Sequence, residues 1–66
     1  MNKGARVEIS VNGFPVLGVV VATFRDFTES RFGPIEFQRL DVKGDDGHYY
    51  SGVDAAYVHA VVREAA

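Results

Sequence analysis

The sequence contains no cysteine among its 66 residues. This absence excludes disulfide bonds and thiolate zinc sites, which stabilise many domains of this size. Two histidines, His48 and His59, are few ligands for a structural metal site. Ordering a chain costs about 1.5 kcal/mol per residue, or roughly 100 kcal/mol here, and a small core only just offsets that cost. We therefore expect the chain to form a homo-oligomer.

An excess of basic charge and a long apolar run are also missing. Seven basic residues are spread among nine acidic ones, and the net charge of −2 disfavours a nucleic-acid partner. The longest apolar run, Val16–Phe24, is far shorter than the roughly 20 residues that span a bilayer, so no membrane association is expected. Met1–Arg6 lacks the apolar region of a signal peptide, which predicts a cytoplasmic location. The apolar content of 47% is typical of one globular domain over residues 1–66.

The run Val16–Phe24 is rich in valine, which predicts a central strand that needs cover on both faces, either in a small barrel or by a partner. Gly18 within it indicates a bend or a close backbone approach. Before it, Arg6–Val11 alternates apolar and polar residues, the pattern of a half-buried strand. Asn12-Gly13 between the two predicts a tight hairpin turn.

The second half of the chain is less regular. Arg25–Pro34 mixes charges with phenylalanines and contains Gly33-Pro34, so we expect a loop there, with a one-turn helix as an alternative. Ile35–Lys43 resumes as a strand, but its apolar residues change phase near Gln38-Arg39, which predicts a β-bulge. A turn over Gly44–Gly47 and a short strand over His48–Val53 follow.

The C-terminal segment supports two interpretations. Tyr57–Val62 fits a closing strand after a turn at Asp54–Ala56, or else Asp54 caps a helix that continues to Ala65. The predicted class is therefore all-β, a small barrel of about five antiparallel strands. The alternative is a four-stranded antiparallel meander with a C-terminal helix.

The order of these elements resembles that of an SH3-like small barrel. The opening Gly4–Ile9, then Gly13, then Gly18–Val20 is similar to the start of KOW-type and related prokaryotic SH3-like domains, in which glycines precede the first two strands. The ending Val53–Val58 is similar to the short helical turn and last strand that close such barrels. The resemblance implies this architecture for most of the chain.

Candidate catalytic residues are few. No elbow or triad context surrounds the serines, which are Ser10, Ser30 and Ser51. His48 beside Asp45 and Asp46 suggests a general base or half of a metal site, but a solvated turn is the favoured interpretation. We therefore expect no enzyme activity, no cofactor and no metal site; a small oligomeric enzyme with a site shared between subunits is the least favoured alternative.

The aromatic residues provide the main functional signal. Phe24 and Phe37 are expected in the core, whereas the other phenylalanines and Tyr50 fall in or beside predicted loops. Aromatic and arginine side chains dominate binding hot spots. The candidate partner-binding site therefore consists of Phe14, Arg25, Phe27, Arg31, Phe32 and Tyr50.

These residues predict a non-enzymatic interaction module that binds a protein partner or assembles with itself. One alternative is a nucleic-acid-binding module whose basic residues are Arg6, Arg25, Arg31 and Arg39. A second alternative concerns Phe27 and Phe32, which would instead fold back to plug an open barrel end.

Overall fold

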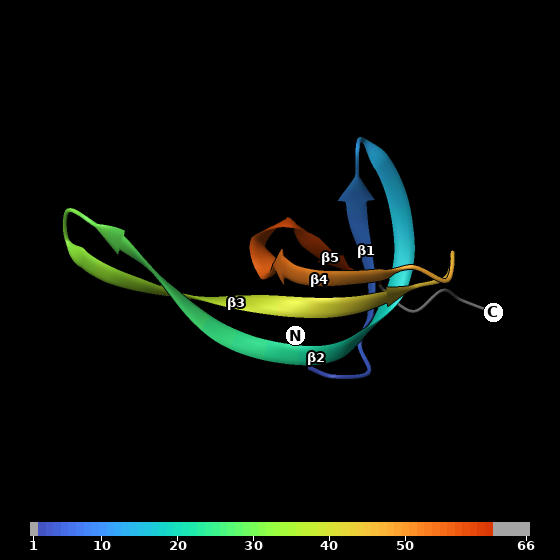
Figure 1. Cartoon of the computed structure of the whole chain (residues 1–66), viewed down its shortest axis with the longest axis horizontal. Helices are drawn as coiled ribbons and strands as arrows, with labels where there is room; N and C mark the ends of the chain where they lie inside the picture. Colours follow the sequence, from blue (N-terminus) through green and yellow to red (C-terminus); the bar gives the residue numbers. More distant parts are fainter. Residues whose placement is uncertain (1, 62–66) are drawn as a thin grey trace.

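The computed structural model describes residues 2–61, which form one antiparallel sheet with the strand order β4-β3-β2-β1-β5 (Figure 1). The elements are β1 (Arg6–Val11), β2 (Phe14–Ser30), β3 (Gly33–Gly44), β4 (Tyr49–Asp54), the 3₁₀ turn η1 (Ala55–Tyr57) and β5 (Val58–Ala60). The predicted all-β class with five antiparallel strands is confirmed. Among the described residues there is no helix that is long and apolar enough to cross a membrane.

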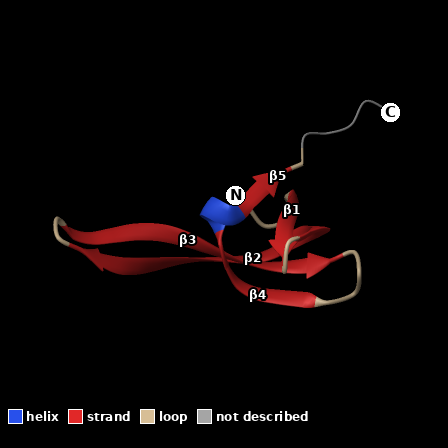
Figure 2. Cartoon of the chain, turned by 90° about the horizontal axis from the view of Figure 1, so that it is seen from above, coloured by secondary structure: helices blue, strands red, loops and turns tan. Residues whose placement is uncertain are grey.

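The core is one cluster of aliphatic side chains from four strands. Its buried members are Val7, Ile9, Val20, Leu40, Val42 and Val58. Tyr50 and Val53 of β4 pack against the same cluster. Because all five strands contribute to one cluster, the sheet curls around it, as Figures 1 and 2 show for the end that contains β1, β4 and β5. This curvature is compatible with a small β-barrel-like fold.

The N-terminal hairpin forms as its sequence predicts. Asn12 and Gly13 have φ values of 52° and 85°, the left-handed conformation that a two-residue hairpin turn requires. Val11 lies opposite Phe14, so β2 begins two residues before the predicted start at Val16. Pro15 is accommodated opposite Ser10 near the end of this hairpin.

Gly18 lies where β2 exchanges one neighbour for another. It pairs with Val7 of β1 on one side and with Gly44 of β3 on the other. A Cβ atom added at Gly18 would lie 2.5 Å from the backbone oxygen of Lys43 and 2.7 Å from a methyl group of Val42. The predicted close backbone approach is therefore present, and it requires glycine.

The predicted loop over Arg25–Pro34 is wrong. β2 continues to Ser30, β3 begins at Gly33, and only Arg31 and Phe32 form the turn between them. The pattern was misleading because both faces of this hairpin contact solvent, so its residues need not alternate between apolar and polar. Gly33, with φ of 108°, ends the turn.

The β-bulge predicted near Gln38-Arg39 is also misplaced. The register shifts between Val20 and Ala22 in β2, and β4 has an irregularity opposite Asp41, between Leu40 and Val42 of β3. β3 itself keeps its pairing with β2 through Gln38 and Arg39. The phase change in the sequence arises because the apolar residues near the start of β3 lie on the face opposite to Leu40 and Val42.

The C-terminal segment forms a turn and a closing strand as predicted, but the turn includes Tyr57 and the strand covers only Val58–Ala60 among the described residues. The Asp54 carboxylate accepts a hydrogen bond of 2.9 Å from the Ala56 N–H and so caps η1. β5 then pairs with β1, with Val58 opposite Ile9. The alternative helix is wrong for the residues up to position 61, and its predicted members Val62 and Ala65 lie outside the described residues.

Candidate interaction site

The distal half of the β2–β3 hairpin projects from the rest of the molecule. Residues Arg25–Gln38, here called the arm, pair only with one another, because β1 pairs with β2 no further than Val19 and β4 reaches β3 only from Arg39 onward. The arm accounts for the elongated shape of 45 × 24 × 20 Å and extends to the left in Figure 1. A two-stranded ribbon without further cover is marginally stable in water.

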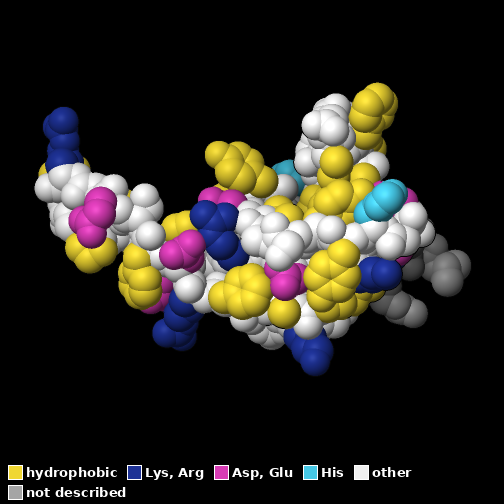
Figure 3. Space-filling view, viewed as in Figure 1, with side chains coloured by type: hydrophobic (Ala, Val, Ile, Leu, Met, Phe, Trp, Pro, Cys, Tyr) yellow, Lys and Arg dark blue, Asp and Glu magenta, His cyan; other side chains and the backbone are white. Residues whose placement is uncertain are grey.

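Four of the six candidate partner-binding residues lie on this arm. Phe27 is 60% exposed on β2 and Phe32 is 94% exposed in the turn, so neither side chain plugs the barrel end. Arg25 and Arg31 are exposed beside them. Figure 3 shows hydrophobic, basic and acidic side chains mixed along the arm.

The two faces of the arm carry different side chains. Phe27 shares one face with Arg25, Glu29 and Glu36, and a guanidinium nitrogen of Arg25 lies 3.8 Å from a carboxylate oxygen of Glu36. We call this the Phe27 face. The opposite face, here called the Phe37 face, carries Asp26, Thr28, Ile35 and Phe37.

Two predicted core phenylalanines are more exposed than the sequence suggests. Phe24, at the root of the arm, is 44% exposed, so its assignment to the core is wrong. Phe37 is half-buried, and its ring lies 4.9 Å from the guanidinium carbon of Arg39. Together with exposed Ile35, these residues add to the apolar surface of the hairpin. Phe24 and Phe37 were not among the candidate partner-binding residues because the sequence predicted both in the core.

The other two candidate residues lie away from the arm. Phe14 is 72% exposed at the start of β2, beside the turn of the N-terminal hairpin, and Figure 1 shows this turn far from the tip of the arm. Tyr50 packs against the core and donates a 2.6 Å hydrogen bond from its hydroxyl to Asp46. That bond raises the pKa of Tyr50 above its ordinary value. The structure therefore does not bring these two residues into one surface with the arm.

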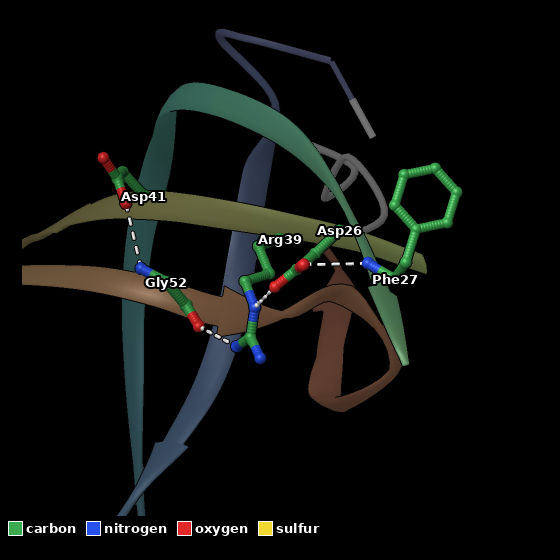
Figure 4. A network of polar contacts seen from close by, with 5 residues as sticks. All are labelled: Asp26, Phe27, Arg39, Asp41 and Gly52. Atoms are coloured by element: carbon green, nitrogen blue, oxygen red, sulfur yellow. Dashed lines mark hydrogen bonds and ion pairs between the residues drawn. The ribbon is translucent and has the colours of Figure 1, made fainter. Parts of the chain in front are cut away.

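A polar network joins the root of the arm to β4 (Figure 4). Arg39 donates from Nε to Asp26 at 2.8 Å and from a terminal nitrogen to the Gly52 carbonyl oxygen, also at 2.8 Å. At the β4 irregularity itself, Asp41 accepts bonds from the N–H of Gly52 and the hydroxyl of Ser51. Gly52 is thus held at both its N–H and its carbonyl group, in the left-handed conformation with φ of 69°.

Asp26 has a second role within this network. While one of its carboxylate oxygens faces Arg39, the other accepts a 2.8 Å bond from the backbone N–H of Phe27. The bond from Arg39, followed by the bond from Phe27, lowers the pKa of Asp26 below its ordinary value. The carboxylate is therefore ionised at neutral pH and links the arm to the curled end of the sheet.

The acidic turn that suggested a base or a metal site is occupied by structural contacts. Asp45 forms a two-pronged ion pair with Arg6, and Asp46 accepts bonds from Tyr50 and from the backbone N–H of His48. No three acidic, histidine or cysteine side chains among residues 2–61 are grouped so that they could hold a metal ion. The bonds of Asp45 and Asp46 instead stabilise the turn between β3 and β4.

The arginines of the nucleic-acid alternative are mostly paired with acids. Arg6 contacts Asp45, and Arg39 contacts Asp26. Arg25 lies near Glu36, as the third pair. Carboxylates thus offset the charge of three of these four arginines.

A comparison of the chain with protein-family models, with curated proteins and with solved structures finds no match.

Proposed function

We propose that this chain is a non-enzymatic interaction module built on an SH3-like barrel, and that the arm is its binding element. The strand order β4-β3-β2-β1-β5 and the 3₁₀ turn before β5 support the architecture. The observation that carries the function is the uncovered arm with the exposed aromatic rings of Phe27 and Phe32. A partner that covered it would bury apolar surface and stabilise a ribbon that is otherwise marginal.

The experiment compares Phe27→Ala and Phe32→Ala with the wild type. Neither side chain belongs to the core, so we expect melting temperatures close to the wild-type value. Loss of a hot-spot aromatic weakens binding by about 2 kcal/mol or more, so association through the arm should fall. Circular dichroism melts and sedimentation or partner capture measure the two effects.

Phe14→Ala is the matched control, since Phe14 is equally aromatic and exposed but lies off the arm. It should leave association unchanged. If Phe27→Ala or Phe32→Ala instead destabilised folding by about 3–5 kcal/mol, the ring would be acting as a core residue. Native-like melting with unchanged association in both arm variants would refute the proposed function.

A further inference from the structure

One edge of the arm presents backbone groups that no described strand uses. Glu29 lies opposite Pro34, which has no N–H to donate, so this pair is one that exchanges no hydrogen bonds. Such pairs alternate with bonded pairs along an antiparallel ladder, so Arg25, Phe27 and Glu29 direct their N–H and C=O groups away from β3. The bond from the Phe27 N–H to the Asp26 side chain agrees with this direction.

The two edges of the arm differ in their capacity to pair. On the β3 edge, Pro34 points its nitrogen outward, and an edge proline blocks the addition of another strand. The β2 edge contains no proline between Arg25 and Glu29, and β1 pairs only as far as Val19. The β2 edge is therefore the one that is open to a further strand.

The sequence along this edge is complementary to itself. Arg25-Asp26-Phe27-Thr28-Glu29 carries opposite charges at equal distances on either side of Phe27. When two such strands run antiparallel with Phe27 opposite Phe27, each Arg25 faces Glu29 of the second copy. Cross-strand pairs of opposite charge and of aromatic rings both stabilise antiparallel sheets.

We propose that the partner of the arm is a second copy of this chain, joined edge to edge through β2 with Phe27 on the two-fold axis. The inference rests on the proposed function and specifies its partner. The outward-facing groups of Arg25, Phe27 and Glu29 then bond to their counterparts, and both arms merge into a four-stranded sheet. A self-complementary surface of this kind closes as a symmetric dimer.

The charges select this register over its neighbours. Outward-facing residues must lie opposite outward-facing residues, so alternative registers differ by two positions. A shift in one direction places Arg25 opposite Phe27, and a shift in the other places it opposite Arg31 of the second copy. Only the register centred on Phe27 pairs Arg25 with an acid on both sides of the axis.

The side chains of the arm are compatible with this pairing. On the Phe27 face, Arg25 already lies 3.8 Å from Glu36, so the second copy would place it between two carboxylates. On the Phe37 face, Asp26 would lie opposite the hydroxyl of Thr28. Asp26 releases the N–H of Phe27 on pairing but keeps its bond to Arg39 through its other oxygen.

The test exchanges the charges across the proposed axis. Arg25→Glu places two glutamates opposite each other, whereas Glu29→Arg places two arginines opposite each other, so each variant alone should dimerise about 10- to 100-fold more weakly than the wild type. An equimolar mixture of the two variants restores opposite-charge pairing and should form a heterodimer. The double variant R25E/E29R should again form a homodimer. Sedimentation equilibrium measures all four samples.

Lys3→Glu is the matched control, because it changes the charge by the same amount at an exposed residue away from the arm, and it should leave dimerisation unchanged. Circular dichroism of each variant confirms that it is folded. A wild-type dimer that persists in both single variants would overturn this register. A wild-type chain that is monomeric at tens of micromolar would also overturn the inference; arm-dependent capture of another protein would then leave the proposed function standing, and its absence would refute both.

Discussion

At the scale of single residues, Asp26 connects the arm to the curled end of the sheet. Its carboxylate bonds to Arg39, which in turn holds the carbonyl group of Gly52 in β4. Arg39 first, and the N–H of Phe27 second, lower the pKa of Asp26 in the folded chain. The side-chain link from β2 to Arg39, which the backbone ladders of β2, β3 and β4 accompany, is therefore strongest when Asp26 is ionised.

This dependence predicts acid destabilisation. A carboxyl group whose folded pKa lies below the unfolded value of about 3.9 contributes stability above that value and loses it as the pH falls through the folded pKa. The melting temperature should therefore drop as the pH falls below about 4, and part of the drop should be absent in Asp26→Asn. Asp45, whose pKa Arg6 lowers, accounts for part of the remaining drop. Thermal melts of the wild type and of Asp26→Asn from pH 6 to pH 2 measure how the melting temperature depends on pH. Identical pH profiles for the two proteins would contradict this role of Asp26.

At the scale of elements, the sequence predicts turns and strands best where a few neighbouring residues determine the local structure. Asn12-Gly13 specifies its turn through left-handed backbone geometry, and Asp54 specifies η1 through its cap. The alternation in Arg6–Val11 identifies β1 because one face of that strand is buried. Each of these predictions depends on residues that contact near neighbours or one common core.

The arm could not be recognised in the same way. Strand alternation reflects the burial of one face, and the hairpin beyond Phe24 buries neither face, so charged residues are tolerated on both. Aromatic and arginine content still selected Phe27 and Phe32 as candidates, but the role of Glu29 appears only when β2 is known to extend through it. Its partner in the proposed dimer is set by strand register, which composition does not encode.

The direction of the backbone groups in β2 predicts different effects of proline at adjacent positions. The Thr28 N–H points toward β3, so Thr28→Pro should break the ladder and expose the arm amides to solvent exchange. The Glu29 N–H points outward, as the nitrogen of Pro34 does on the other strand, so Glu29→Pro should keep the arm formed while removing self-association. Hydrogen exchange of the arm amides at low protein concentration compares the two. Equal loss of protection in both variants would show that the assigned bonding direction is wrong.

At the scale of the whole molecule, stability and association lie in different parts of the chain. The six buried core residues of the described chain belong to the curled end of the sheet, and none lies between Phe24 and Arg39. The arm instead carries a row of exposed aromatic and charged groups. A chain of this size has a narrow margin of stability, so apolar residues outside the core indicate a contact made after folding.

This separation predicts the outcome of removing the arm. Asp26 lies opposite Phe37 as a hydrogen-bonded pair, which a two-residue Asn-Gly turn can close, so replacing Phe27–Glu36 by Asn-Gly keeps the network at Arg39 intact. The shortened chain should fold, with a melting temperature close to that of the wild-type monomer at low concentration. It should remain monomeric at concentrations where the full chain associates. An unfolded product would show that the rest of the sheet needs the arm to fold, and a folded product with wild-type association would place the interface outside the arm.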